Sequence, residues 1–176
     1  MTQNAVFWLR DDFRIEDNPA LSYASSNHDT VSALYIYDKS VFDDKREAQK
    51  WWLSRSLEEF KVDLEKYNIC LEIVEGNQLS ERIFLEKIPN KDHKVKKLKK
   101  IKKLFKKNIS CKNILPNKDW YKKFDTYWQP SETTAKKYLE KFIKNDIYDY
   151  GTKRDFPSIK GTSKLSPFIR NGQIGV

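Results

Sequence analysis

The sequence predicts an α/β fold in the first half of the chain and a helical unit in the second half. Short β-rich apolar runs at residues 4–10, 30–37 and 70–76 alternate with segments whose apolar residues have helical spacing. From residue 130 onward the apolar residues recur every three or four positions. Strands that alternate with helices are typical of a parallel sheet with right-handed crossovers.

The composition narrows the class of protein. The chain has 176 residues, of which 39% are hydrophobic and 34% are charged, so it is long enough to bury a core and too apolar for wholesale disorder. No apolar run approaches the roughly 20 residues of a membrane-spanning helix. The two cysteines and two histidines stand apart, which argues against a zinc site or a disulfide framework. We therefore expect a cytoplasmic protein without a metal or a membrane partner.

The first half contains two predicted helices between its three strands. Residues 20–26 suit a short helix, and Asn18 followed by Pro19 is typical of a helix start. Residues 46–67 predict a longer helix with a regular apolar face. Ligands of open α/β sheets bind beyond the carboxyl ends of the strands, which places the loop at residues 10–18 in the functional position. The chain contains neither GxGxxG nor GxxxxGK[ST], so no dinucleotide fingerprint or P-loop supports a phosphate site there.

One segment accounts for the whole net charge of +9. Residues 91–107 contain ten lysines and one aspartate, and their apolar residues form a helical stripe. Two interpretations remain open: the segment binds a phosphate backbone without base specificity, or it is a solvated linker pinned by its few apolar side chains. Four lysines at its centre are the candidate DNA-binding residues of this segment: Lys96, Lys97, Lys99 and Lys100.

The second half begins with a helix and ends with a hydroxyl-rich tail. The tripeptide at residues 130–132 predicts a helix start, and we expect the aromatic residues Trp120, Tyr127 and Trp128 to lie in the core. In the tail, Gly161 allows a close backbone approach. The hydroxyls that follow, at residues 162, 163 and 166, lie at a predicted helix start and suit an anion. A helix-capping role for the first two hydroxyls is the structural alternative.

Three motifs resemble the DNA photolyase/cryptochrome family: FWLRDDFRIEDNPAL at residues 7–21, the W-x-P-S-E start at 128–132, and the tail YGTKRDFPSIKGTSKLSP at 150–167. The chain resembles a class I cyclobutane-dimer photolyase that is shortened internally and at the C-terminus. The resemblance implies an incomplete Rossmann-like parallel sheet with helices, followed by the first helices of an all-α FAD-binding domain. We expect an α/β domain over residues 1–90, a lysine-rich linker over 91–113 and the start of the helical domain over 114–176.

The resemblance also implies the ligands and their sites. FAD is the implied cofactor, and Arg154 is the residue that would contact DNA phosphate. The implied cofactor-binding residues all lie in the tail: Tyr150, Thr162, Ser163, Lys164, Leu165 and Ser166. No catalytic side chain and no metal ligand is implied, and the antenna chromophore stays unknown because the family pattern skips the stretch after residue 77.

The family repairs cyclobutane pyrimidine dimers in DNA by blue-light-driven electron transfer from reduced FAD, acting on a flipped-out lesion. The residues that would enclose the flavin are absent from this sequence, so we expect the chain by itself to hold FAD weakly and to lack repair activity. Two alternatives stay open. One is a short module that binds damaged duplex or single-stranded DNA non-specifically, and the other is a non-catalytic interaction protein or a cryptochrome-like light-signalling remnant. The open sheet edge is expected to be capped by residues 79–90 or to support self-association.

Overall fold

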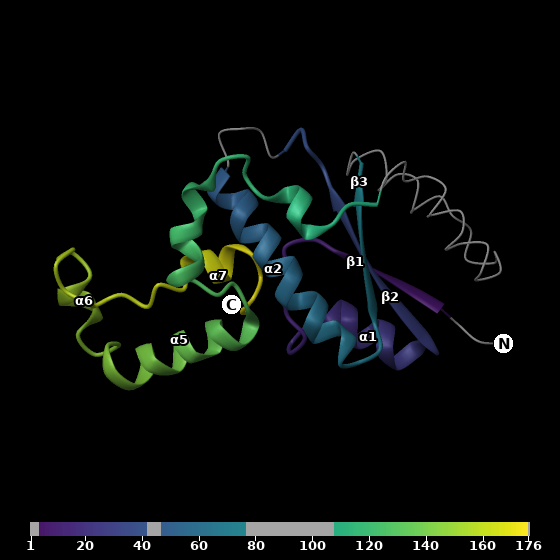
Figure 1. Cartoon of the computed structure of the whole chain (residues 1–176). Coiled ribbons are helices and arrows are strands. Elements are labelled where there is room, and N and C mark those ends of the chain that lie inside the picture. Colours follow the sequence, from purple (N-terminus) through teal and green to yellow (C-terminus); the bar gives the residue numbers. More distant parts are fainter. Residues whose placement is uncertain (1–3, 42–46, 77–107, 176) are drawn as a thin grey trace.

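A computed structural model describes residues 4–41, 47–76 and 108–175. Its centre is a three-stranded parallel sheet in the order β1 (Asn4–Leu9), β2 (Thr30–Tyr37) and β3 (Cys70–Glu75). The strand boundaries confirm the three predicted strands to within one residue. The sheet and its helices form one end of the molecule, and the helical unit extends from it to the other end (Figure 1).

Two helices connect the strands and cover one face of the sheet. Helix α1 (Pro19–Asn27) follows β1, and helix α2 (Glu47–Glu65) follows β2. Because side chains alternate along a strand, the odd-numbered residues of all three strands face these helices. Phe7, Ala33 and Leu71 lie opposite one another across the sheet and are buried in this core. The expected α/β fold class is therefore confirmed.

The even-numbered strand residues form a second apolar face. Leu34, Ile36 and Val74 are buried there, and Val6 and Trp8 of β1 pack against them. A strand that is buried on both faces has a nearly continuous apolar sequence, which explains why β2 consists mainly of apolar and aromatic residues. Within the described ranges β1 pairs with β2 alone, so self-association through the sheet edge stays a prediction.

The chain rejoins the α/β unit at residue 108 before it enters the helical unit. The Ile109 amide donates to the Ile73 carbonyl at 3.0 Å, and Asn108 forms an antiparallel bridge with Val74. The short 3-10 helix η2 (Cys111–Ile114) packs on α2, where Cys111 and Ile114 join the sheet core. The lysine-rich residues 91–107, and residues 79–90 as the expected edge cap, lie outside the described residues. The predicted domain boundaries stay predictions.

The helical unit contains four further elements. A 3-10 helix, η3 (Asp119–Thr126), is followed by helices α5 (Glu132–Asn145), α6 (Tyr150–Lys153) and α7 (Ser166–Arg170). As predicted, α5 starts just after residue 130, with Ser131 as the N-cap that accepts from the Thr134 amide. Figure 1 shows α6 at the end of the molecule farthest from the sheet. No helix in the described part of the chain is long and apolar enough to cross a membrane.

A second core joins the helical unit to α2. Trp51 and Trp52 of α2 pack with Ala135, Leu165 and Phe168, and their rings lie edge-on to neighbouring aromatic rings. Edge-on packing is a preferred geometry for aromatic pairs. Trp128 belongs to this core as expected. The expectation is wrong for Tyr127, which follows η3 and is 76% exposed, and for Trp120, which is also an exposed residue.

Candidate functional site

The loop after β1 is a structural clamp. Asn18 accepts a hydrogen bond from the Leu21 amide and so caps α1, while its amide group donates to the Arg14 carbonyl at 3.0 Å. The Arg14 guanidinium donates to the carbonyls of Asp17 and Gly172, at 3.0 and 3.2 Å. Arg14 and Asn18 therefore bond to backbone groups, and Arg14 ties the loop to residue 172 near the end of the chain. These contacts give the loop a structural role, at the position that the sequence predicts for a binding loop.

A buried carboxylate fastens the same loop to the helical unit. Glu132, only 7% exposed, accepts hydrogen bonds from the amides of Ile15 and Glu16 at 2.6 and 3.2 Å. Lys136, one turn later on α5, forms an ion pair with Glu132 at 2.9 Å. A buried charge that is fully hydrogen-bonded is tolerated, whereas an unpaired one is costly. The P-S-E motif thus starts α5 and docks it onto the loop after β1.

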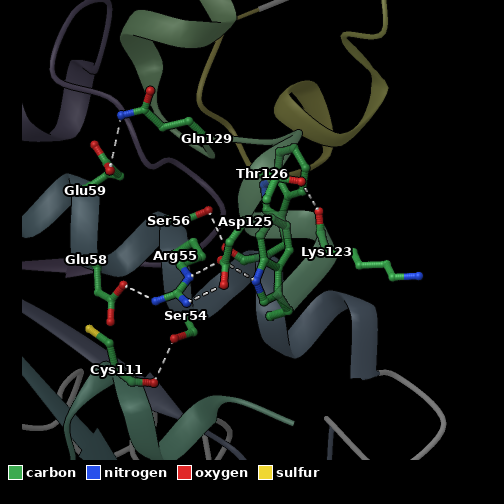
Figure 2. Close-up of polar contacts among 12 residues, drawn as sticks. Ser54, Arg55, Ser56, Glu58, Glu59, Cys111, Lys123, Asp125, Thr126 and Gln129 are labelled. Atoms are coloured by element: carbon green, nitrogen blue, oxygen red, sulfur yellow. Dashed lines mark hydrogen bonds and ion pairs between the residues drawn. The ribbon is translucent and has the colours of Figure 1, made fainter. Parts of the chain in front are cut away.

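A second polar cluster fixes η3 on α2 (Figure 2). The Arg55 guanidinium meets the Asp125 carboxylate with two hydrogen bonds, at 2.8 and 3.0 Å, and also pairs with Glu58. Trp51 donates its indole N–H to the same carboxylate at 3.0 Å. These hydrogen bonds, chiefly that from Arg55, hold the pKa of Asp125 below its usual value.

The first cavity lies beyond the carboxyl end of the sheet. It has a volume of about 370 Å³ and is bounded by Asp11 after β1 and Tyr35 of β2 on one side. Aromatic rings of both units form most of its apolar wall: Trp51, Trp52, Phe124 and Trp128. Asp11 and Arg170 form an ion pair of 3.3 Å at its rim. This is the position where open α/β sheets bind ligands, and the wall suits a planar aromatic molecule.

The second cavity contains part of the predicted FAD site. It has a volume of about 340 Å³ and lies between α5 and the tail loop at residues 160–164. Of the six predicted cofactor-binding residues, Thr162, Ser163 and Lys164 line this cavity. Its other lining residues come from the same loop and from α5: Lys137, Tyr138, Lys141, Phe142, Asp146 and Lys160.

The structure places the other predicted site residues around this cavity. Tyr150 packs edge-on against the cavity-lining Phe142, with ring centroids 5.5 Å apart, so it lies one ring away from the cavity. Leu165 is buried in the second core, and Ser166 is exposed at the start of α7. Arg154 is exposed, lies over the Tyr150 ring and pairs with its neighbour Asp155. Lys96, Lys97, Lys99 and Lys100 lie outside the described residues.

The backbone of the tail loop has two constrained positions. A Cβ atom on Gly161 would lie 2.4 Å from the Cβ of Lys153, so the glycine permits a close approach of the tail loop to α6. Lys164 has a φ of +55°, a conformation that non-glycine residues seldom adopt and that often occurs at functional sites. Ser163 accepts from the Leu165 amide, while the N-cap of α7 is Leu165, without a side-chain cap. Neither Thr162 nor Ser163 therefore caps α7 by a side-chain hydrogen bond, while Ser163 bonds to the backbone just before this helix.

Three lysines of the second cavity were not predicted from the sequence: Lys137, Lys141 and Lys160. The sequence contains part of the information needed to find them: Lys137 and Lys141 are four residues apart and so share one face of α5. Nothing in the local sequence relates that face to the tail loop some 20 residues later. Among the described residues, no three His, Cys, Asp or Glu side chains gather as metal ligands would.

Comparison with known proteins identifies the family. The DNA photolyase family model matches residues 5–107, a range that continues through the lysine-rich segment. A deoxyribodipyrimidine photo-lyase of Agrobacterium fabrum is 25% identical in an alignment that covers 98% of this chain and 51% of the relative. That alignment extends over 249 residues, which exceeds the length of this chain and fits the expected internal skip. The chain spans about half the length of this relative.

Two solved structures have the same fold. A class III photolyase from Agrobacterium tumefaciens matches 99% of this chain and 51% of its own, with a TM-score of 0.76 and 24% identity. A photolyase from Sulfolobus tokodaii, solved with two FAD molecules, matches 97% of this chain and 52% of its own, with a TM-score of 0.63 and 18% identity. At these identities the structures show the fold, and the expected class I subtype stays a prediction. Given the family-model match over more than half of its residues, the chain belongs to the DNA photolyase family.

Proposed function

We propose that this chain supplies the phosphate-binding portion of an FAD site in a photolyase-type protein. One observation carries the proposal: the tail segment predicted to contact FAD lines a basic, hydroxyl-bearing cavity instead of capping a helix. Hydroxyls and lysines suit the diphosphate of FAD, because phosphate oxygens accept charge-assisted hydrogen bonds. The residues present therefore fit this part of the cofactor.

Each residue has a distinct part in this proposal. Thr162 and Ser163 donate their hydroxyl protons to phosphate oxygens, and Lys164 adds a positive charge at the open side of the cavity, where its side chain is exposed. Tyr150 positions the cavity wall through the Phe142 ring. When FAD is bound, it supplies the light-driven electron-transfer chemistry of the family.

Repair activity needs more than these contacts. The described part of the cavity encloses a volume suited to a diphosphate, and Thr162 and Lys164 are exposed to solvent. A cofactor that keeps few of its contacts binds weakly. We therefore propose that the 176-residue chain binds FAD weakly and does not repair pyrimidine dimers alone, with DNA as the substrate of the complete photolyase architecture. The cytoplasmic location expected from the sequence belongs to the same proposal.

The test separates weak binding from no binding. Equilibrium dialysis of the chain against FAD should show saturable binding, and desalting should then remove the flavin absorbance. The double variant Thr162→Ala/Ser163→Ala should weaken FAD binding about tenfold, since each lost hydrogen bond to a charged group costs on the order of 1.5 kcal/mol or less at an exposed site. The matched control is Thr133→Ala/Ser158→Ala, which removes two exposed hydroxyls outside the cavity. Stoichiometric flavin after desalting, light-driven repair by the chain alone, or no FAD binding at all would each overturn the proposal.

A second candidate function is supported by the first cavity: binding of an additional light-harvesting chromophore. Tyr35 is 4% exposed, lines this cavity, and its hydroxyl has no hydrogen-bond partner among the described residues. Burial, with a smaller contribution from Asp11, raises the pKa of Tyr35 above its usual value, so the phenol stays a proton donor. The Sulfolobus photolyase, with its two FAD molecules, was described as implying a novel light-harvesting cofactor.

A planar flavin is the probe for this candidate. FMN should quench the fluorescence of Trp51 and Trp52, whose rings line the cavity, and Tyr35→Phe should weaken that binding severalfold by removing the unpaired donor. Thr162→Ala/Ser163→Ala serves as the control because it leaves the first cavity intact. Equal FMN binding by the wild type and Tyr35→Phe would exclude the candidate.

Non-specific DNA binding is the remaining proposal. Arg154 is exposed over the Tyr150 ring, and Tyr148 and Phe156, nearby in the sequence, have exposed rings, a combination suited to phosphate contact and base stacking. Affinity for single-stranded DNA should fall steeply with salt, and Arg154→Gln should weaken it more than Arg10→Gln does. Binding that does not depend on salt would reject this role.

A further inference from the structure

One segment of the helical unit is ordered without a core of its own. Residues 143–160, here called the α6 lobe, extend from the last turn of α5 through α6 to the tail loop. We propose that the α6 lobe docks a second polypeptide, equivalent to the half of a photolyase that this chain does not span. The inference goes beyond the proposed function, because it concerns a protein contact that needs no FAD.

The α6 lobe buries none of its residues. Only Asp146 and Lys153 are half-buried, and all its other residues are exposed. Beyond α5, its hydrogen bonds reach no described residue outside 142–161. Burial of apolar surface is the main term that offsets the entropy lost when a chain becomes ordered. The described part of this chain does not supply that burial to the lobe, so a partner that covers the lobe would stabilise it.

Exposed apolar side chains concentrate in the α6 lobe, at the end of the molecule farthest from the sheet (Figure 1). Six of the thirteen large hydrophobic residues that are exposed in the described part of the chain belong to it, with exposures between 37% and 92%: Ile143, Ile147, Tyr148, Tyr150, Phe156 and Ile159. Single exposed apolar residues are common on soluble proteins, whereas a concentration of them marks an interaction site.

Three isoleucines form the aliphatic part of this surface: Ile143, Ile147 and Ile159. The backbone hydrogen bonding of α5 continues through the amide of Ile147, so Ile143 and Ile147 share one helical face. Asp146 and Lys160 line the same cavity. Ile147 and Ile159 are their neighbours in the chain, so these two residues also lie close together. The isoleucines therefore belong to one surface built from both ends of the lobe.

The charges of the lobe balance one another and do not select a charged partner. Lys153 pairs with Asp149 at 2.7 Å, and Arg154 pairs with Asp155 at 3.5 Å. Bases stack on aromatic rings, and isoleucine offers them no such ring. The α6 lobe therefore suits an apolar protein face better than a phosphate backbone or an anionic membrane.

The size of the relatives indicates which protein would supply that face. The Agrobacterium tumefaciens photolyase matches 99% of this chain, and so includes the lobe, but this match takes up only 51% of its own length. About as much chain again therefore accompanies the same fold in that structure. A second copy of this chain is less suitable, because its three apolar clusters in the described part are already buried. The unmatched half of a photolyase is thus the proposed partner.

The test is co-expression of the full chain with the half of the Agrobacterium fabrum photo-lyase that lies outside the matched region. The tagged half should capture the chain in equal amounts, and the complex should persist in high salt, because apolar contacts are not screened as charges are. Amide hydrogen exchange in α6 should slow in the complex. No capture of the wild-type chain, or capture without slower exchange in α6, would overturn the inference.

The variant Ile143→Gln/Ile147→Gln/Ile159→Gln should reduce capture by about tenfold or more, because a few apolar anchors provide most of the binding energy of an interface. Glutamine favours helix at least as well as isoleucine does, so α5 is preserved. The matched control is Val41→Gln/Val62→Gln/Tyr67→Gln, which replaces three similarly exposed apolar side chains of the α/β unit. The control should be captured as the wild type is.

Three results would overturn the assignment of the α6 lobe to this partner. The first is an equal loss of capture in both variants, which would show a general effect of surface apolarity. The second is a dimer of the chain alone that the isoleucine variant abolishes, which would assign the surface to a second copy. The third is unchanged capture of the isoleucine variant together with loss of its binding to single-stranded DNA, which would assign the surface to nucleic acid.

Discussion

At the residue scale, Gly172 shows how strongly backbone space is limited at the junction of the two units. Gly172 has a φ of +62°, and a Cβ atom there would lie 1.8 Å from the Asp11 carbonyl oxygen. The Phe13 amide and the Arg14 side chain bond to carbonyls of residues 171 and 172, so the glycine cannot shift without loss of these contacts. The close contact between the loop after β1 and residues 171–172 therefore requires a residue without a side chain at position 172.

Gly172→Ala should lower the free energy of unfolding by about 3 kcal/mol or more, because it adds a backbone clash to an unfavourable φ. Gly151→Ala is the matched control, since nothing lies within 4 Å of the added Cβ atom there. Urea denaturation of both variants measures the difference. Equal stability of the two variants would contradict this explanation of the junction.

At the element scale, the position of η3 depends on polar contacts as well as on packing. Asp125 near the end of η3 receives two hydrogen bonds from Arg55 and one from Trp51 (Figure 2). Bidentate pairs of this kind are stronger than ordinary surface ion pairs. Without them, η3 would rest on α2 through ring contacts, such as that of Phe124 with Trp51, and through the hydrogen bond from the Trp120 indole to Glu47.

Asp125→Asn should cost about 1 kcal/mol of stability at pH 7, a modest value because the carboxylate is 36% exposed. The pKa of Asp125 is lower in the folded chain than in the unfolded chain. Its contribution is therefore complete above the ordinary carboxyl pKa of 3.8 and is lost as the pH falls below it toward the folded value. Urea denaturation at pH 7 and at pH 3 should show the difference between variant and wild type shrinking at pH 3. A difference that grows on acidification would refute this origin.

At the scale of the whole molecule, the α/β and helical units are joined by a few buried groups. Glu132 reaches from α5 to the loop after β1, and Gln173 accepts from the Trp52 indole of α2 at 3.1 Å. Both side chains are buried, at 7% and 1% exposure. This junction holds the tail loop and the sheet in one arrangement, so that both cavities have walls from segments distant in the sequence.

Glu132→Gln should accelerate hydrogen exchange at the amides of Ile15 and Glu16, because a neutral amide cannot accept both hydrogen bonds as strongly as the carboxylate does. A stability loss of about 2 kcal/mol should accompany it, the usual cost of a weakened charged hydrogen bond in a buried site. Glu140→Gln, an exposed change on the same helix, is the control. Unchanged exchange rates at both amides would show that Glu132 does not hold the loop after β1 on α5.

Much of the fold follows from the sequence by itself. The strand and helix boundaries follow from apolar periodicity and from caps such as Asn18 and Ser131, which are local properties of the chain. The family also follows from the sequence, since its motifs consist of consecutive residues. Thr162 and Ser163, which line the second cavity, could be selected as candidate site residues in the same way, because they belong to one short motif.

The tertiary structure decided what these motifs do. Arg14 and Glu132 are conspicuous charges in the sequence, and only packing shows that they hold two units together and do not face a ligand. Tyr127 looked like a core residue by type, yet its position after η3 exposes it. The lysines of α5 meet the tail loop only through the folding of the intervening residues, because a cavity is a property of distances in space, and sequence separation carries no information about those distances.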